Sequence, residues 1–271
     1  MRKIKVSFLL VFLFWYTGFP QESKGQNLQL VTTIPIPKPE KVSIDRFNNI
    51  YIAETKGNIH QFNSSGKLLQ TFSHNKPGKI SHLEAWQAVT IFVFYQDFQQ
   101  ILFLDRFLTP SPNISLNDLQ DGFIRLATIS NDQNLWLIDE SDLSLKKYNL
   151  KQNNFTIISP LNLQLNSKRM DLNFIREYQN HLFINDRLNG IHIFDILGNY
   201  LRSIPEKDLE YFNFLKDEMY FLRNNNLHFL NIYNQKERTL ATPEQNPIKF
   251  ILASEKQVFL ITDSALKIYT Y

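Results

Sequence analysis

The sequence predicts an all-β fold, a six-bladed β-propeller of four-stranded antiparallel blades, from three observations. An apolar strand recurs with a period near 40 residues, polar clusters separate the short strands, and long helical periodicity is absent. The chain also holds 23 Phe and 11 Tyr, which fit a pleated, half-buried surface. Units of about 40 residues with four strands each are typical of propeller blades. An open twisted sheet or a sandwich is the alternative that the same strands allow.

The repeating unit is clearest near the N-terminus. Residues 42–45 form a short strand, residues 50–54 an apolar strand and residues 59–63 an alternating strand, and a turn around Gly66 leads into residues 68–72. The least regular part is residues 98–121. The apolar second strand is expected to begin six times, at Ile50, Ile91, Leu135, Leu182, Met219 and Val258.

The two ends of the repeat fit together. The last unit has strands near residues 248–253, 258–262 and 265–271, and it lacks an outer strand. Residues 28–34 form a spare strand at the other end. Pairing of the spare strand with the last blade would close the ring and remove two exposed edges. We therefore expect a single propeller domain over residues 27–271.

Residues 1–26 are expected to be a signal peptide. Arg2, Lys3 and Lys5 precede an apolar run from Val6 to about Gly18, which is shorter than the roughly 20 residues that a membrane-spanning helix needs. An uncleaved anchor is the alternative. The mature chain is predicted to have no transmembrane span and to be exported, periplasmic or associated with the cell envelope.

Charge and cysteine content exclude several classes of protein. Residues 1–26 hold four of the 29 Lys and Arg residues and one of the 26 Asp and Glu residues, so the remainder is balanced. A balanced domain has no overall basic bias for nucleic acid, and none is expected as a partner. Because the chain has no cysteine, it has neither disulfides nor thiolate metal sites.

Two segments resemble the NHL-type repeat. Residues 58–68 and 190–200 each end a strand in Phe followed by Asn or Asp, at Phe62 and Phe194, and then turn at a Gly. The chain is also similar to the wider TolB-like group of six-bladed propellers. The resemblance implies the fold, whereas the NHL-type group contains scaffolds, ligand binders and a few enzymes, so it implies no single function.

The candidate binding residues are charged and lie on one predicted rim. Loops on a rigid scaffold often carry function, although Asp and Asn also form tight turns, which is the structural alternative. Two long connections, residues 108–122 and 159–171, are expected to reach the same rim. The candidates are Glu54, Asp97, Asp139, Glu140, Asp186, Arg187, Arg223, Asp263, Lys168 and Arg169.

Signals for catalysis and for metal binding are weak. Residues His60, His192 and His228 share a position in the third strand, but equivalent positions of different blades are far apart, so we expect structural roles. The sequence contains no nucleophile elbow, zinc-binding helix motif or phosphate-binding Gly loop. No catalytic residue, metal site or cofactor is therefore predicted. Asp45, Glu84 and Glu177 lie near predicted innermost strands, where acids of several blades could converge.

The leading hypothesis is an exported, non-catalytic propeller scaffold that binds a protein or another cell-envelope component through one rim. An envelope protein is the expected partner. The alternative is a metal-dependent, lactonase-like hydrolase or lyase with a site at the central channel, for which bound Ca²⁺ is possible. A third hypothesis is a carrier that holds a small ligand at the channel mouth.

Overall fold

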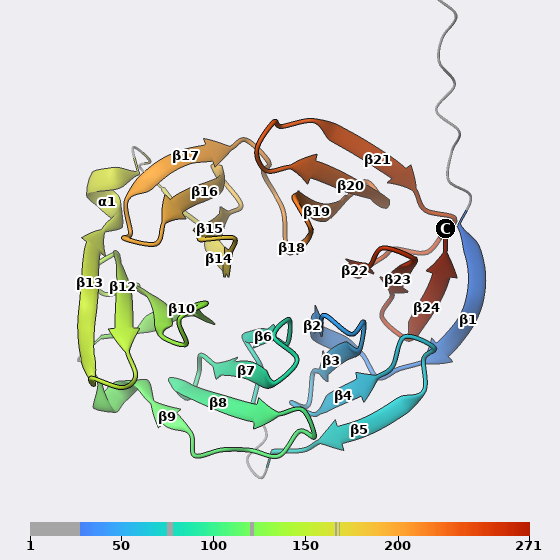
Figure 1. The fold of residues 1–271 in the computed structure, drawn as a ribbon, viewed down its shortest axis with the longest axis horizontal. Helices are drawn as coiled ribbons and strands as arrows, with labels where there is room; N and C mark the ends of the chain where they lie inside the picture. Colours follow the sequence, from blue (N-terminus) through green and yellow to red (C-terminus); the bar gives the residue numbers. More distant parts are fainter. Residues whose placement is uncertain (1–27, 75–77, 120–121, 166, 168) are drawn as a thin grey trace, which may run out of the picture.

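The predicted six-bladed propeller is confirmed. Its described residues form 24 strands in six four-stranded antiparallel sheets, set as blades around a ring (Figure 1). The predicted signal peptide, residues 1–26, lies outside the described residues. The computed structural model describes residues 28–74, 78–119, 122–165, 167 and 169–271.

The strands of each blade follow one another from the axis outward. The innermost strands are β2 (Pro39–Ile44), β6 (His82–Glu84), β10 (Ile124–Ile129), β14 (Leu172–Tyr178), β18 (Phe212–Leu215) and β22 (Phe250–Ala253). The second strands start within one residue of the predicted positions. They are β3 (Ile50–Glu54), β7 (Thr90–Tyr95), β11 (Leu135–Asp139), β15 (His181–Asp186), β19 (Glu218–Arg223) and β23 (Gln257–Ile261).

The outer half of each blade completes the sheet. The third strands are β4 (Ile59–Phe62), β8 (Gln100–Asp105), β12 (Ser144–Asn149), β16 (Gly190–Asp195), β20 (Asn226–Asn231) and β24 (Ala265–Thr270). The outermost strands are β5 (Leu68–Phe72), β9 (Ile114–Ser115), β13 (Asn154–Pro160), β17 (Tyr200–Ile204), β21 (Glu237–Ala241) and β1 (Gln29–Pro35).

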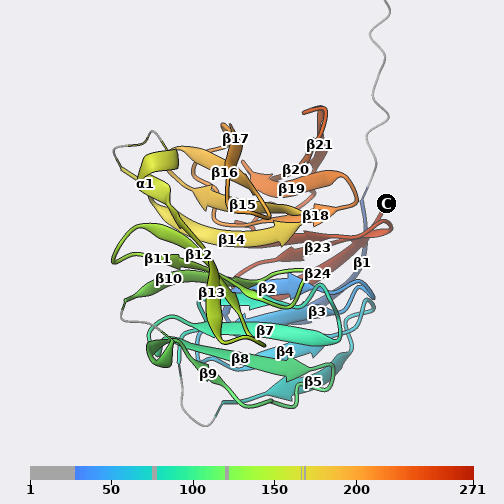
Figure 2. The same cartoon turned by 60° about the vertical axis from the view of Figure 1, so that its left-hand side comes forward.

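The N-terminal strand closes the ring, as predicted. Strand β1 pairs antiparallel with β24, from Gln29 opposite Thr270 to Pro35 opposite Ala265. Figure 2 shows the two strands side by side from a second direction. The last blade thereby gains its fourth strand from the opposite end of the described chain, so β24 has no free edge.

The second blade is the irregular one, which agrees with the sequence. Its outermost strand is only two residues long, because Pro110 and Pro112 lack the N–H that a continuous ladder needs. Between these prolines, the Ser111 backbone N–H still donates to the Phe103 carbonyl at 2.9 Å. A short 3-10 helix, Leu116–Asp118, follows the strand.

Polar side chains stabilise many of the tight turns. The Asp45 carboxylate accepts the backbone N–H groups of Phe47 at 2.8 Å and Asn49 at 2.9 Å. Asp105 and Asp195 each accept the corresponding two N–H groups of their own turns. An Asp or Asn that bonds to the backbone just after it replaces hydrogen bonds that the strand ladder can no longer provide.

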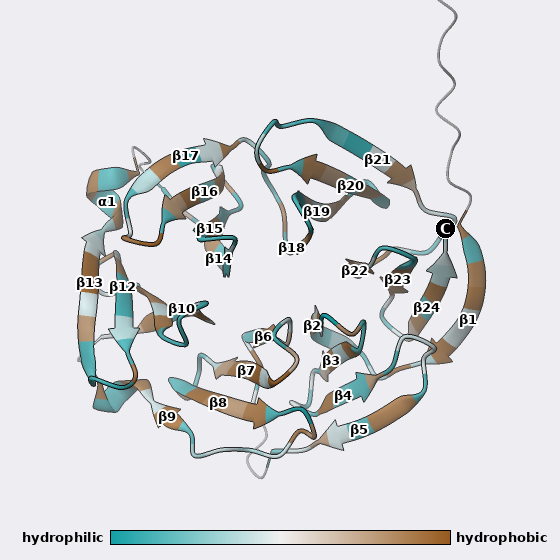
Figure 3. Cartoon of the chain, viewed as in Figure 1, coloured by the Kyte–Doolittle hydropathy of each residue, from teal (hydrophilic) through white to brown (hydrophobic). Residues whose placement is uncertain are grey.

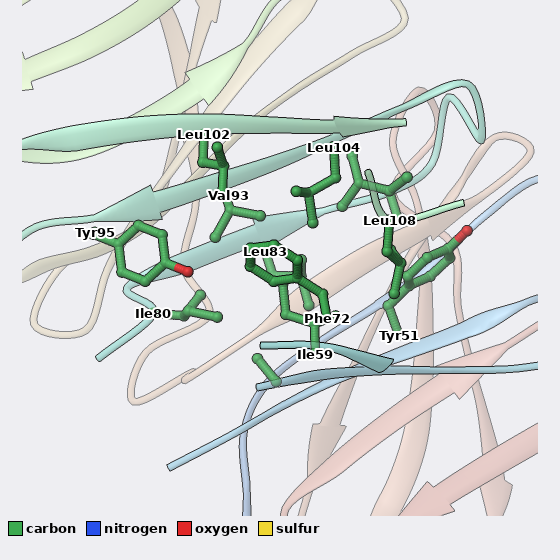
Figure 4. Close-up of a cluster of buried hydrophobic side chains, with 13 residues drawn as sticks. Tyr51, Ile59, Phe72, Ile80, Leu83, Val93, Tyr95, Leu102, Leu104 and Leu108 are labelled. Atoms are coloured by element: carbon green, nitrogen blue, oxygen red, sulfur yellow. The ribbon is translucent and has the colours of Figure 1, made fainter. Parts of the chain in front are cut away.

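The hydrophobic core is divided among the gaps between blades. Six clusters of buried apolar side chains lie one in each gap between neighbouring blades. Figure 4 shows the cluster between the first two blades, where Tyr51 and Ile59 of the first pack with Leu83 and Val93 of the second. The strands carry most of the hydrophobic residues and the joining loops are largely hydrophilic (Figure 3). Burial between blades therefore holds the ring together.

Candidate functional site

The strand order gives the ring two distinct rims. Rim 1 carries the turns from the second to the third strands and the connections between blades. Rim 2 carries the turns from the first to the second strands and from the third to the fourth. Nine of the ten candidate residues lie in or beside segments of rim 1, and the tenth, Lys168, lies outside the described residues.

Three of the candidate acids are buried inside their own blades. Glu54, Asp139 and Asp186 end the second strands of blades one, three and four. Their side chains are at most 9% exposed, which leaves little carboxylate surface for a partner. The sequence placed them on an open rim, but the neighbouring third strand covers them. That strand carries a basic side chain two residues beyond the position opposite each acid.

These acid and base pairs recur between the second and third strands. His60 Nε2 lies 3.9 Å from the carboxylate of Glu54, and His192 Nε2 lies 3.4 Å from Asp186. Lys146 Nζ donates to Asp139 at 2.7 Å. Each pair lies within one blade, so the aligned third-strand residues do not converge on one ion.

Hydrogen bonding sets the charge of the buried acids. Burial tends to raise the pKa of Asp139, but the Lys146 ammonium and the Ser141 backbone N–H outweigh it and hold that pKa below its usual value. The pKa of Asp186 is also lowered: burial opposes the shift, and the Asn189 amide and two backbone N–H groups outweigh burial. Both acids therefore act as stable acceptors at neutral pH.

The fifth and sixth blades use a different acid. Blade five has Arg223 where blades one, three and four have an acid, and its guanidinium donates to Glu206 at 2.8 Å and to Glu237 at 2.6 Å. His228 Nδ1 lies 2.6 Å from the same Glu237 carboxylate. In blade six, Lys267 pairs with Glu244. Arg223 is thus one member of an ion-pair cluster at the edge of blade five.

A longer chain of ion pairs crosses rim 1. Arg125 Nη1 donates to Glu140 at 2.6 Å and Arg125 Nη2 to Asp171 at 3.1 Å. Arg187 Nε donates to the other oxygen of Asp171 at 2.8 Å, and Arg187 Nη1 to Glu210 at 2.8 Å. The side chains of this rim-1 ion chain are 32% to 68% exposed. The hydrogen bonds that Arg187 donates to Asp171 and Glu210 raise the pKa of Arg187 above its ordinary value. The chain runs from blade three to the connection before blade five.

The remaining described candidates are exposed. Asp97 and Arg169 lie on rim 1, and the carbonyl of Arg169 accepts the side-chain amide of Asn189 at 2.8 Å. Asp263 lines a cavity of about 540 Å³ and its carboxylate is 3.9 Å from Lys249 Nζ. These residues do not gather into one cluster with the rim-1 ion chain.

The two long connections reach the rims differently. The described residues between β13 and β14 include helix α1 (Leu161–Gln164) and lie on rim 1, as predicted. The segment 108–122 was placed wholly on rim 1, which is wrong for its first half. Leu104 bridges to Pro110, so residues 106–109 form a rim-2 turn and residues 110–113 run beside β8. Only the part after β9 belongs to rim 1.

Polar side chains of four blades meet at the axis of the ring. Glu84 on β6 accepts the Thr128 hydroxyl at 2.5 Å and lies 3.2 Å from His82 Nε2. Arg176 on β14 reaches Glu84, with Nε 4.0 Å from Oε1, and donates to the Asn213 side chain. All of these residues are at most 4% exposed. Burial lowers the pKa of His82. We call this group the axial cluster.

Sequence reasoning identified only one member of the axial cluster. Of the three acids noted near innermost strands, Glu84 belongs to it. Asp45 stabilises its own turn and accepts the Tyr51 hydroxyl at 3.1 Å. Glu177 points into the gap between blades three and four, where it accepts the Trp136 indole N–H at 2.6 Å and the Asn131 backbone N–H at 3.0 Å. Arg176 was not predicted as a member of a site, because an Arg within a strand is ordinarily expected to face solvent.

Among the described residues, no group of three or more His, Cys, Asp or Glu side chains is arranged to hold a metal ion. Within the same part of the chain, no helix is long and apolar enough to cross a membrane.

Comparison with known proteins supports the fold. No protein-family model matches the chain, and no curated protein matches its sequence. Among solved structures it is similar to BamB from Moraxella catarrhalis, with 8% identity, a TM-score of 0.53, and coverage of 90% of this chain and 100% of BamB. Virginiamycin B lyase from Staphylococcus aureus gives 11% identity and a TM-score of 0.60, and the match covers 90% of this chain and 100% of the lyase. The extracellular domain of a putative one-component system from B. thetaiotaomicron gives 13% identity and a TM-score of 0.55. The match covers 85% of this chain and 32% of that protein. At these identities the likeness shows the propeller fold alone.

Proposed function

We propose that this chain is an exported, non-catalytic propeller scaffold that binds a protein of the cell envelope through rim 1. The rim-1 ion chain is the observation that carries the proposal. It presents alternating charges from blade three to the connection before blade five on a rigid support. Such a row of charges can orient a partner of complementary charge and fix its register.

Apolar side chains beside the ion chain favour a protein as the partner. Leu143 and Leu188 lie in turns that carry members of the ion chain, and Phe123 lies in the connection just before β10. They are 39%, 47% and 40% exposed. The Phe123 carbonyl accepts the backbone N–H of Glu140 at 2.9 Å, so Phe123 is a direct neighbour of a residue of the ion chain. Exposed apolar anchors among polar residues are typical of protein interfaces.

The axial cluster supports a non-catalytic role. Its acid and base contact one another and are almost removed from solvent. A substrate would have to displace these side chains to reach Glu84 or His82. Rim 1, in contrast, is accessible without any rearrangement.

Export and family membership are part of the same proposal. The basic start and short apolar run of residues 1–26 support a cleaved signal peptide. The structural likeness to an extracellular domain is compatible with an envelope location. The Phe-Asn and Phe-Asp strand ends support membership of the NHL-type, TolB-like group.

Photo-crosslinking in intact cells tests the rim. A benzoylphenylalanine replaces Leu188 on rim 1 or, as the matched control, Leu197 on rim 2 of the same blade, which is 66% exposed. We expect a protein adduct from position 188 and none from position 197. Adducts from position 197 alone would contradict the choice of rim.

Charge reversal tests the ion chain itself. Arg187→Glu places a third acid beside Asp171 and Glu210, so we expect a lower adduct yield from a photoprobe at Leu143. Lys151→Glu makes the same change in charge on rim 2 and is the control. Equal adduct yields for both variants would show that the ion chain does not contribute to binding.

The metal-dependent hydrolase or lyase is the second candidate, and the fold likeness to virginiamycin B lyase is the observation in its favour. Metal analysis of the purified protein, together with turnover of small esters and lactones, tests it. Tightly bound Ca²⁺ with turnover would replace the scaffold proposal.

A further inference from the structure

A cavity on rim 2 lies beside the axis of the ring. It encloses about 530 Å³ and is lined by the ends of innermost strands and the turns that follow them. Trp86, Tyr178 and Phe214 supply aromatic walls. Tyr178 and Phe214 are stacked, with ring centroids 4.2 Å apart and planes 5° apart. A cavity of this size with aromatic walls fits a small organic molecule.

Two residues that line this cavity carry buried donors with no acceptor among the described residues. Arg176 is 3% exposed, and its Nε has no hydrogen-bond partner, although Nη1 donates to Asn213. The indole Nε1 of Trp86 is also buried without a partner. A buried donor without an acceptor is costly, so a ligand that supplies acceptor oxygens gains from both groups.

The charge around the cavity favours an anion. Its lining contains four basic and two acidic side chains. The acid Glu255 already pairs with Lys216 at 2.9 Å, and the Asp45 oxygens accept hydrogen bonds from their own turn and from Tyr51. The buried Arg176 is thus joined by Arg46 and Lys256 at the edge of the cavity.

Glu84 limits the charge of that anion. Its carboxylate lies 4.0 Å from Arg176 Nε on the side of the axial cluster and offsets part of the guanidinium charge. A dianion would therefore meet more repulsion from Glu84 than a monoanion. A carboxylate with two acceptor oxygens matches the planar guanidinium and carries a single charge.

We propose that the rim-2 cavity binds a small aromatic monocarboxylate, with its oxygens toward Arg176 and Trp86 and its ring along Tyr178 and Phe214. The site lies on the rim opposite the proposed protein interface, so it goes beyond that function and does not depend on it.

Calorimetric titration of the full chain tests the proposal with three probes of similar size. Benzoate is the monoanion, benzamide its neutral match and phenyl phosphate its dianionic match at about pH 8. We expect saturable single-site binding of benzoate with a Kd of about 1 mM, which is ordinary for so small a ligand. Benzamide and phenyl phosphate should bind at least about fivefold more weakly.

Variants locate the site. Trp86→Phe keeps an aromatic ring at this position but removes the indole N–H, and it should weaken benzoate binding about tenfold. Lys256→Gln removes one edge charge and should weaken it about threefold, since this side chain is exposed. Lys236→Gln is the matched control, because Lys236 is exposed on the third-to-fourth turn of blade five, outside the cavity lining.

Several results would overturn the proposal. These are no saturation by benzoate up to about 20 mM, equal affinity for benzamide, tighter binding of phenyl phosphate, or wild-type affinity in both Trp86→Phe and Lys256→Gln. Crosslinking at Leu188 on rim 1 does not depend on benzoate binding on rim 2. If one of the two proposals fails its test, the other can therefore still be tested.

Discussion

Glu84 Oε1 on β6 and Arg176 Nε on β14 lie 4.0 Å apart at the axis of the ring, and both residues are at most 3% exposed. The two strands belong to the second and fourth blades, so this ion pair joins blades that are not neighbours in the ring. It therefore links the ring across its centre, whereas the apolar clusters link it around the circumference.

Glu84→Gln should destabilise the protein by about 3 kcal/mol, because it leaves the Arg176 charge buried without a counterion. The measurement is the free energy of unfolding from urea titration. Glu84→Leu combined with Arg176→Met removes both charges, and we expect it to recover most of the loss. A single variant as stable as the wild type would mean that water reaches Arg176 and solvates it.

The matched control for this prediction is a surface pair. Glu255 and Lys216 are 2.9 Å apart, and their side chains are 61% and 69% exposed. Glu255→Gln should leave the unfolding free energy nearly unchanged, since exposed ion pairs contribute little. A large effect of this control would point to a general charge effect in place of the burial of Glu84.

Two buried histidines should make stability depend on pH below neutrality. Burial lowers the pKa of His82 and of His192 from 6.5 in the folded protein. The unfolded chain then binds more protons, so the unfolding free energy is complete above about pH 6.5 and falls as the pH decreases toward the folded pKa values. Each histidine contributes a slope of at most about 1.4 kcal/mol per pH unit.

Substitution separates the contribution of each histidine. His82→Gln should reduce the slope of unfolding free energy against pH between about 6.5 and 5, and the double variant with His192→Gln should reduce it further. Each variant is compared with its own value at about pH 8, which removes any loss that does not depend on pH. An unchanged slope in the double variant would contradict the burial of neutral imidazoles.

The blade repeat could be predicted because its signals are local. Strand, turn and strand follow each other within about 40 residues, and Asp or Asn residues mark the turns by bonding to their own backbone. Ring closure was also predictable, because residues 28–34 formed a spare strand at one end of the repeat and the last unit lacked an outer strand at the other end. The prolines at 110 and 112 marked the irregular second blade, but the rim on which that segment starts depends on pairing with β8.

The candidate site was predictable only in part. The burial of Asp139 and Asp186 depends on a base seven and six residues later, on the neighbouring strand. That spacing was visible in the sequence and could have separated these acids from the exposed Glu140. The axial cluster was not predictable, because Thr128 and Arg176 come from different blades and are 44 and 92 positions from Glu84. Only closure of the ring brings them together.

Removal of the closing strand should make the chain self-associate. A variant that starts at residue 36 lacks β1 and exposes the edge of β24, which then offers unpaired backbone groups to another chain. We expect a lower melting temperature and oligomers that increase with concentration in light scattering. A variant that starts at residue 28 keeps β1 and is the control. Identical scattering from both variants would show that β1 does not protect the edge.

Gly190→Ala should destabilise the fourth blade by about 2 kcal/mol. Gly190 has a φ of +102°, and a Cβ at this position would lie 2.3 Å from the backbone carbonyl oxygen of Ile204, which cannot move without disturbing β17. Leu188→Ala in the same turn is the control, because Leu188 is 47% exposed, and we expect it to change the urea midpoint little. If Gly190→Ala unfolds at the same urea concentration as the control, the turn must adopt a second backbone conformation that a side chain tolerates.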